Sequence, residues 1–302
     1  MKADYIWMNG KIVPFQEANV HFLSPTMHYG VGVFEGIRCY ETPKGAAIFR
    51  LREHLQRLLD SCLILGISKL HYSIDDLCQA TFETIQANGF KGCYIRPLMY
   101  LDGPLGLDLD ASVAKIGIAA WEWDTYLGDK GLESGVHMMV SSFTRNHINA
   151  SMTKAKISGN YVNSVLAKTL ALRSGYDEAI MLDPNGYVSE CSGENLFVVN
   201  DQSIDTPPRA TILEGITRNS LITIANDSGY KITENLISRD QLYIADELFV
   251  CGTAAEVTPV RAVDHRTIGL GKPGPITKTI QQAFFETVNG NGKRSEEWLE
   301  YI

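Results

Sequence analysis

The chain has no excess of basic side chains and no long apolar run. Its 302 residues include 27 Lys and Arg against 35 Asp and Glu, which gives a formal net charge of −8. Because nucleic-acid binding needs a basic surface that neutralises phosphates, this balance argues against a nucleic-acid partner. A membrane helix needs roughly 20 consecutive apolar residues, and no segment approaches that length, so we expect no membrane partner.

Cysteine is also scarce. The six cysteines are scattered and form no CxxC pair, which disfavours a disulfide framework or a zinc site. The histidines show no metal-ligand spacing, so we expect no metal. The first residues, MKADYIWMNGK, lack the apolar segment and the cleavage site of a secretory signal. These features are typical of a cytoplasmic protein with reduced thiols.

The composition is that of a globular protein, with 45% hydrophobic and 21% charged residues. We expect a smaller N-terminal α/β domain over residues 1–121, an aromatic and turn-rich interdomain loop over 122–132, and a larger C-terminal α/β domain over 133–302. Tight turns such as Asn9-Gly10 join the strands, and the helices come in blocks. The predicted fold class is therefore α/β of the α+β type, with mixed or antiparallel sheets and flanking helices, and not a Rossmann alternation.

Three predicted helices bear on the later argument. The first has its apolar residues on one face, namely Leu51, Leu55, Leu58, Leu59 and Cys62. The second opens at Ser73 with a capping-box pattern and closes at Asn88-Gly89. The third follows Ser158 as a possible N-cap and is amphipathic, with Tyr161, Val162, Val165, Leu166 and Leu170 at helical spacing.

The segment from Thr153 to Tyr161 places two lysines just before that third helix. A lysine at such a junction could form a Schiff base with a carbonyl compound if its amine is partly desolvated. Most lysines are solvated surface charges, however, so the segment alone does not identify a catalytic residue.

Other segments carry weak signals of the same kind. Gly215-Ile216-Thr217 at a helix start, and Gly252-Thr253-Ala254 after a strand, could bind a phosphate with their backbone amides. Glu190 at a strand end could pair with a protonated pyridine nitrogen, or could simply be exposed. Tyr94 and Arg96 alternate along a strand and so share a face, which suits a small carboxylate ligand or a cross-strand pair.

Six motifs in order carry a family resemblance. They are Tyr29 to Tyr40, Tyr94 to Leu98, Lys156 to Tyr161, Ser189 to Phe197, Gly215 to Arg218, and Gly252 to Val260. Together they closely resemble the branched-chain amino-acid aminotransferases, which are class IV aminotransferases with the D-amino-acid-aminotransferase-like fold (fold type IV) and bind pyridoxal 5'-phosphate. The resemblance covers nearly the whole chain, from about Tyr5 to Phe285.

The resemblance implies a role for each matching residue at the cofactor. Lys156, three residues before Gly159-Asn160-Tyr161, matches the Schiff-base lysine that also moves the proton between the substrate α-carbon and the cofactor. Lys154 does not match, and we expect it to be solvated or to lie behind the site. The other implied cofactor contacts are Tyr161 to the phenolic oxygen, Glu190 to the ring nitrogen, Leu213 on the ring face, and Arg57, Ile216, Thr217 and Thr253 to the phosphate.

The resemblance also implies the substrate site. The α-carboxylate would be received by Tyr94 and by the amides of Thr253 and Ala254, with Arg96 and Arg38 nearby. Arg38 is our candidate for the γ-carboxylate of glutamate. An apolar slot for the side chain would be formed by Phe34, Tyr161, Trp123 and Tyr126. Tyr29 and the loop Leu105-Gly106-Leu107 would reach across the interface of a homodimer or higher homo-oligomer.

These residues predict a ping-pong aminotransferase that acts on L-leucine, L-isoleucine and L-valine with 2-oxoglutarate and glutamate. Rivals of the same fold are a D-amino-acid or (R)-amine aminotransferase and an aminodeoxychorismate-lyase-like enzyme. A non-catalytic cofactor-binding protein is disfavoured, because binding alone requires neither Lys156 nor Glu190. Departures from the family pattern at Ser158, at Cys191-Ser192 and in the short loop 102–108 affect the substrate slot more than the lysine chemistry.

Overall fold

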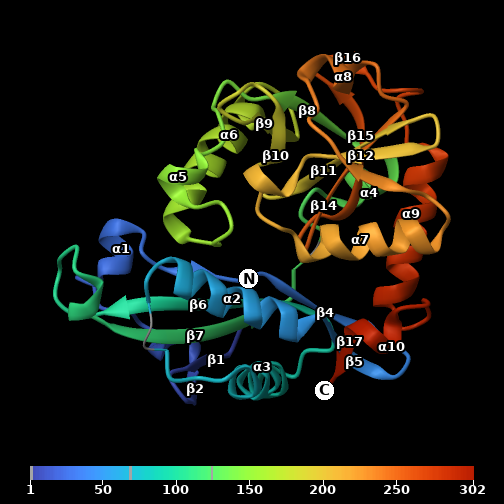
Figure 1. Cartoon of the computed structure of the whole chain (residues 1–302). Helices are drawn as coiled ribbons and strands as arrows, with labels where there is room; N and C mark the ends of the chain where they lie inside the picture. The colour runs from blue at the N-terminus through green and yellow to red at the C-terminus, as the bar shows by residue number, and fades with distance from the viewer. Residues whose placement is uncertain (1–2, 68–69, 124) are drawn as a thin grey trace. The chain divides into compact units, whose positions relative to one another are not determined.

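The chain divides into two compact units, each of which is described by itself below. The computed structural model describes residues 3–67, 70–123 and 125–302 (Figure 1). Unit 1 comprises Met1–Trp123, Ala155–Asn160 and Thr287–Ile302, and unit 2 comprises Asp124–Lys154 and Tyr161–Glu286. Asp124, within the predicted interdomain loop, lies outside the described residues, and the division at 122–132 stays a prediction. Both units combine strands with helices, which confirms the predicted fold class.

Unit 1 is built on one sheet whose described strand pairs are all antiparallel. The strand order is β17-β5-β4-β6-β7-β1-β2, and β3 pairs with β6. The predicted Asn9-Gly10 turn joins β1 to β2, and its residues have φ of 50° and 98°, as such a tight turn requires. The strands are β1 (Tyr5–Met8), β2 (Lys11–Pro14), β3 (Val33–Phe34), β4 (Ile37–Thr42), β5 (Gly45–Phe49), β6 (Cys93–Asp102), β7 (Val113–Trp121) and β17 (Leu299–Tyr301). The helices are α1 (Pro25–Tyr29), α2 (Leu51–Ile64), α3 (Ile74–Asn88) and α10 (Ser295–Trp298).

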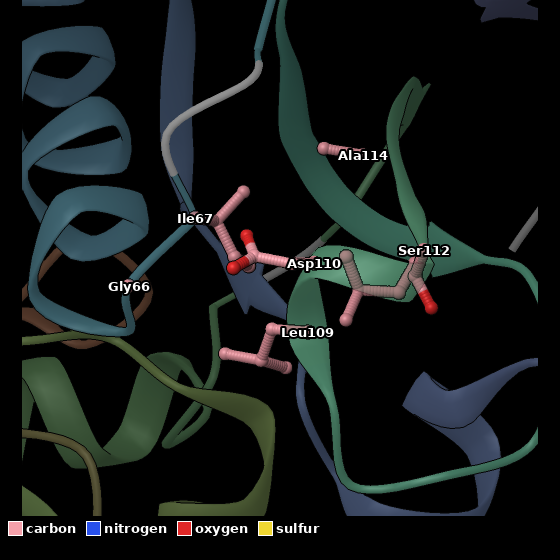
Figure 2. A pocket seen from close by; sticks show the side chains of 7 residues that line it. Gly66, Ile67, Leu109, Asp110, Ser112 and Ala114 are labelled. Carbon is pink, nitrogen blue, oxygen red and sulfur yellow. The ribbon is translucent and has the colours of Figure 1, made fainter.

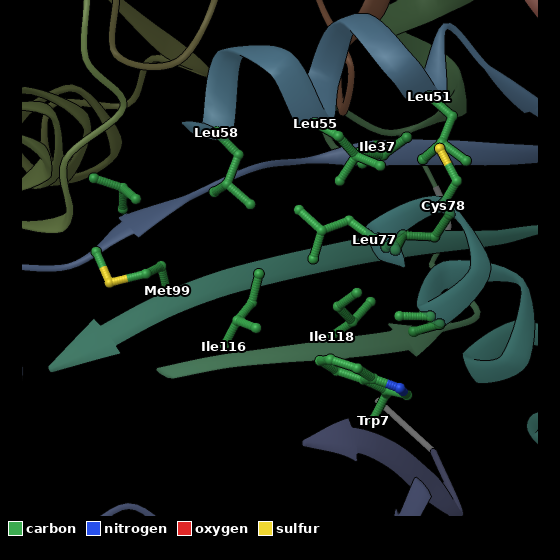
Figure 3. Close-up of a cluster of buried hydrophobic side chains, with 14 of the residues drawn as sticks. Trp7, Ile37, Leu51, Leu55, Leu58, Leu77, Cys78, Met99, Ile116 and Ile118 are labelled. Atoms are coloured by element: carbon green, nitrogen blue, oxygen red, sulfur yellow. The ribbon is translucent and has the colours of Figure 1, made fainter. Parts of the chain in front are cut away.

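Helix α2 packs its predicted apolar face into the core of unit 1. Leu51, Leu55 and Leu58 are fully buried, and Figure 3 shows them directed toward the strands, near Ile37. Helix α3 begins at the predicted capping box, in which Ser73 and its third helical residue bond each other reciprocally. Because the apolar face of α2 is fixed along the helix, the residues on its other faces are held in a defined position.

Unit 2 is built on a mixed sheet. The strand order is β10-β9-β8-β15-β14-β11-β12-β13, with β16 paired to β15. The pairs β8–β9, β8–β15 and β12–β13 are parallel, and the other pairs are antiparallel. The strands are β8 (Val136–Val140), β9 (Glu178–Leu182), β10 (Val188–Cys191), β11 (Asn195–Asn200), β12 (Ser203–Thr206), β13 (Ile232–Glu234), β14 (Glu247–Gly252), β15 (Glu256–Val263) and β16 (Arg266–Thr267).

The helices of unit 2 lie before, between and after these strands in sequence. They are α4 (Asp129–Ser134), α5 (Ile148–Ser151), α6 (Tyr161–Arg173), α7 (Ile216–Asp227), α8 (Arg239–Tyr243) and most of α9 (Pro275–Val288). Among the described residues, no helix is both long and apolar enough to span a bilayer.

Helix α6 forms where it was predicted, but with its apolar face outward. An amphipathic helix is expected to bury its apolar face, yet Val162, Val165 and Leu166 are 63%, 60% and 46% exposed. The buried positions are small residues, including Ala167 and Ala171, which pack in a cluster with residues of β9. The predicted helix is confirmed, but its larger apolar side chains are exposed in this chain taken alone.

Candidate active site

Lys156 is held by its backbone against unit 1. Its N–H donates to Ser61 Oγ at 3.0 Å, and its carbonyl accepts from the Phe34 N–H at 3.1 Å. The next residue, Ile157, forms an isolated antiparallel bridge with Val33. Ser158, the possible N-cap, instead begins a 3-10 turn that precedes α6. The lysine backbone is thus fixed beside β3, and its Nζ lies 4.9 Å from the centroid of the Phe34 ring.

Arg57, predicted to bind phosphate, is fixed by a buried carboxylate. Glu35 is fully buried and accepts from Arg57 Nε at 2.6 Å and Nη2 at 2.9 Å, and from His54 Nδ1 at 2.7 Å. Burial raises the pKa of Glu35, but Arg57 and the His54 hydrogen bond outweigh it, so this pKa lies well below its usual range. Burial lowers the pKa of His54. The group is therefore an ionised carboxylate that orients a neutral imidazole and a bidentate guanidinium.

The hydroxyl of Tyr94 lies against Gly36, at a position where a larger residue would clash with it. A Cβ at Gly36 would lie 2.0 Å from the Tyr94 hydroxyl oxygen. The Tyr94 ring is 5% exposed and contacts the rings of Trp121 and Trp123, with centroids 5.3 Å and 4.6 Å away. Its strand neighbour in β4 is Arg38, which pairs with it in the antiparallel register. The predicted carboxylate-binding tyrosine, the slot residue Trp123 and Arg38 thus lie together in unit 1.

Arg96 lies among aromatic rings of the same unit. Its guanidinium carbon is 4.8 Å from the ring centroid of Phe34, 5.5 Å from that of Tyr94 and 6.0 Å from that of Trp121. The contact with Tyr94 confirms that the two residues share a face of β6. Arg96 Nε and Trp121 Nε1 are buried and have no hydrogen-bond partner within the described parts of the chain. A cation stacked on rings, with a buried donor unused, suits an anionic ligand.

Glu190, predicted to face a pyridine nitrogen, is the centre of a hydrogen-bond network in unit 2. It is 5% exposed, so it is not an exposed strand residue. Its Oε1 accepts from Arg145 Nε at 2.7 Å, and its Oε2 accepts from Asn195 Nδ2 at 3.2 Å and from the Leu213 N–H at 3.1 Å. These three N–H donors fix the orientation of the carboxylate.

The predicted phosphate-binding residues Ile216 and Thr217 open helix α7, and both are buried. Gly215 is the N-cap and makes no side-chain capping hydrogen bond. The positive end of a helix dipole favours an anion. A Cβ at Gly215 would lie 2.1 Å from Asn195 Oδ1. The start of α7 is therefore packed directly against a residue that binds Glu190.

Thr253 and Ala254 lie in the turn after β14 and are half-buried. A Cβ at the preceding Gly252 would lie 3.2 Å from the Gly193 carbonyl oxygen and 3.8 Å from Glu194. This turn therefore lies close to the chain segment that follows Glu190.

Two tyrosines and two buried carboxylates share unit 2. Burial, with the carboxylates of Glu194 and Glu178, raises the pKa of the Tyr126 hydroxyl well above its ordinary value, so Tyr126 stays protonated. Tyr161 lies near enough to contribute to that shift. Burial and the Glu178 carboxylate raise the pKa of Glu194 to about 8.

The remaining predicted residue, Tyr29, ends α1 and is 43% exposed. In unit 1 it contacts the ring of His28 and none of the rings around Arg96. A small hollow elsewhere in unit 1 contains no predicted site residue (Figure 2). Its lining is Gly66, Ile67, Leu101, Leu109, Asp110, Ser112 and Ala114.

Sequence reasoning missed the residues that support the site from behind. Glu35 lies inside a quoted motif, but nothing local distinguishes it from a structural corner. Arg145 carries no signal at all, because it lies 45 residues from Glu190 in the chain. Asn195 lies in the Gly193 to Phe197 motif, so its position, though not its partner, could have been singled out. These residues act through contacts that form only in the fold.

The comparisons with known proteins agree along the whole length. Residues 32–263 match the family described as "Amino-transferase class IV". A branched-chain-amino-acid aminotransferase of Pseudomonas aeruginosa is 48% identical over 98% of this chain and 97% of its own length. The crystal structure of the Escherichia coli branched-chain amino acid aminotransferase has a TM-score of 0.97 and 47% identity, and 99% of each chain is covered.

A third relative has been solved with a small molecule related to the predicted cofactor and substrate. The branched-chain amino acid aminotransferase of T.th., complexed with N-(5'-phosphopyridoxyl)-L-glutamate, has a TM-score of 0.95 and 46% identity, covering 100% of this chain and 99% of the other. With the lysine, the carboxylate network and the uncapped helix already placed in the two units, this similarity confirms the expected family. The chain belongs to the class IV aminotransferases.

Proposed function

We propose that the chain is a pyridoxal-phosphate-dependent branched-chain aminotransferase, which transfers amino groups between L-leucine, L-isoleucine or L-valine and 2-oxoglutarate. The observation that carries this is full-length similarity, at 46% to 48% identity, to enzymes named for that activity. One cofactor carries the amino group from the first substrate to the second, so the mechanism is ping-pong.

The residues present fit this cofactor. Glu190 accepts from three N–H donors and suits a protonated ring nitrogen, and the uncapped start of α7 suits a phosphate. When bound, pyridoxal phosphate supplies an electron sink for the bonds at the substrate α-carbon. In our proposal Lys156 holds the cofactor covalently and moves the α-proton. Tyr161 binds the phenolic oxygen, Leu213 packs on the ring, and Arg57, Ile216, Thr217 and Thr253 hold the phosphate.

For the substrate, we propose that Tyr94 and the amides of Thr253 and Ala254 receive the α-carboxylate. Phe34, Tyr161, Trp123 and Tyr126 form the apolar slot. Arg38 remains our candidate for the γ-carboxylate of glutamate, and Arg96 is a second candidate because its buried Nε lacks a partner within the described residues. Substituting each arginine by methionine separates the two, since the correct one raises KM for 2-oxoglutarate far more than KM for L-leucine.

We also propose that the protein is a homodimer or a higher homo-oligomer. The outward face of α6 exposes Val162, Val165 and Leu166, and Leu172 beside them is 55% exposed. Tyr29, Leu105 and Leu107 are 43%, 46% and 83% exposed. Exposed apolar side chains grouped on one helix, as on α6, are typical of an interaction site. Light scattering on the purified protein measures the assembly, and a monomer at micromolar concentration contradicts it. We propose a cytoplasmic location, which suits the six free thiols.

The proposed reaction is tested by absorbance. The purified protein should absorb in the near-visible region, L-leucine should bleach that band, and 2-oxoglutarate should restore it. A response to D-alanine or to an (R)-amine, with none to L-leucine, would assign the chain to a rival activity of the same fold. A band that no amino donor bleaches would indicate a cofactor-binding protein without turnover.

A further inference from the structure

Lys154, the second residue before Lys156, is bound by a loop of unit 2. Its Nζ donates to the Arg209 carbonyl, to the Ile212 carbonyl at 3.2 Å, and forms an ion pair with Glu214 Oε1 at 3.1 Å. An ammonium group has three N–H donors, so these acceptors use all of them. This lysine, expected to be solvated or to lie behind the site, therefore binds two main-chain carbonyls and one carboxylate of a single loop.

That loop, residues 209–215, contains Leu213, a proposed cofactor contact, and leads into α7. The Leu213 N–H donates to both Glu190 oxygens, at 3.1 Å and 3.3 Å, and the Leu213 carbonyl accepts from Asn195 Nδ2 at 3.1 Å. Gly215, at the end of the loop, is the N-cap of α7. The two carbonyls that Lys154 binds belong to Arg209 and Ile212, which precede Leu213 in the chain. Lys154 therefore restrains the backbone just before the Leu213 amide that binds Glu190.

The loop has little regular structure, and Glu234 also holds it through Arg209 Nε at 3.4 Å. After a 3-10 turn at Arg209–Thr211, residues 212–215 belong to no helix or strand. Ser189 Oγ donates to the Thr211 carbonyl at 3.0 Å. Ile212 is 1% exposed, and a carbonyl that loses a charged donor is costly to leave unpaired. Removing the Lys154 ammonium should therefore shift the loop and not leave its carbonyls unpaired.

A boundary between the two units falls between Lys154 and Ala155. Unit 2 includes Lys154, whereas Ala155–Asn160 belong to unit 1. Lys156 is fixed through its backbone to Ser61 and Phe34 of unit 1, and Lys154 is fixed through its side chain to loop 209–215 of unit 2. Lys156 is thus held by residues of unit 1, and Lys154 by residues of unit 2.

We propose that Lys154 is a positioning residue that clamps loop 209–215, so that the Leu213 amide holds Glu190 and the start of α7 is fixed for the phosphate. This role rests on the proposed function, because it concerns the cofactor that Glu190 and α7 would bind. It acts on cofactor retention, and Lys154 itself touches no reacting atom.

The test compares Lys154→Met, which removes the charge at similar length, with Lys154→Arg, which keeps it. Loss of a charge-assisted bond of this kind should weaken the binding of pyridoxal phosphate to the apoprotein roughly tenfold, measured by fluorescence titration. The pH titration of the near-visible band should shift in Lys154→Met, while Lys154→Arg should lie within about twofold of wild type in affinity. Lys130→Met, at an exposed lysine of α4, is the matched control and should leave both unchanged.

The outcomes are distinguishable. If wild type binds pyridoxal phosphate and turns over, but Lys154→Met retains wild-type affinity and an unshifted titration, the clamp is refuted and the function stands. If wild type binds no pyridoxal phosphate, the proposed function fails and the clamp fails with it. If Lys154→Met does not fold, Glu214→Ala removes one of the three contacts from the other side. A several-fold weaker affinity in that variant supports the clamp, whereas an unchanged affinity refutes it.

Discussion

Gly36→Ala should damage both the use of substrate and stability, but not the binding of cofactor. The added Cβ would lie 2.0 Å from the Tyr94 hydroxyl oxygen and 2.9 Å from its Cζ. Non-bonded atoms settle at about 3.5 to 4.0 Å, so the Tyr94 hydroxyl would have to move by more than about 1 Å. The rings of Trp121 and Trp123 pack against Tyr94, so it cannot swing away without moving them.

The magnitude follows from two effects. Overpacking of this kind costs about 1 to 3 kcal/mol, which should lower Tm by several degrees. A catalytic group misplaced by about 1 Å can cost on the order of 100-fold in rate, so kcat/KM for L-leucine should fall by roughly that factor. Affinity for pyridoxal phosphate should stay close to wild type, because Tyr94 is proposed to bind substrate and not cofactor.

Steady-state kinetics, cofactor titration and thermal unfolding of three variants check this reasoning. Gly92→Ala is the control, because its Cβ would meet only ordinary contacts at 3.6 Å and 3.7 Å. Adding Tyr94→Phe to Gly36→Ala should recover part of the lost Tm without restoring kcat/KM. Wild-type kcat/KM in Gly36→Ala, or an equal loss in cofactor affinity, would refute the assignment of Tyr94 to the substrate carboxylate.

Two further predictions concern the lysines and a buried acid. Lys156→Ala should abolish both turnover and the near-visible band, while Lys154→Ala should keep most turnover at saturating cofactor; equal losses would mean that the wrong lysine was chosen. The pKa of Glu194 is raised from 4.5 to about 8, so its contribution to stability is full below pH 4.5 and is lost as the pH rises toward 8. Glutamine does not ionise. The free energy of unfolding of Glu194→Gln, measured in urea, should therefore rise relative to that of wild type by about 1.4 kcal/mol per pH unit between pH 5 and 8. A difference between the two proteins that does not change with pH would contradict this.

Features set by neighbouring residues could be predicted from the sequence. The Asn9-Gly10 turn needs two positive φ values, and few residue pairs tolerate them. The capping box at Ser73 depends on residues three positions apart. The shared face of Tyr94 and Arg96 follows from the alternation of a strand.

The supporting contacts of the candidate site could not be predicted in that way. Glu35 bonds His54 and Arg57 from 19 and 22 residues away, and Arg145 bonds Glu190 from 45. No local pattern selects one arginine over another for such a partner, because the pairing depends on which strand and helix the fold places together. The roles of Lys156 and Glu190 came from family resemblance, and what the structure adds is how their backbones and carboxylates are held.

Helix α6 shows what an apolar pattern specifies and what it leaves open. Apolar periodicity indicates that one face of a helix is covered, but it does not say by what. In α6 the face that packs inside unit 2 is made of small residues such as Ala167 and Ala171, which allow close approach to β9. The larger Val162, Val165 and Leu166 lie on the exposed side. If a second copy of the chain covers these residues, each apolar face of α6 has its own role. One face packs inside unit 2, and the other forms an interface between copies. The helix that begins directly after the Lys156 segment would then be restrained from both sides, so assembly would contribute to holding the proposed catalytic lysine in place.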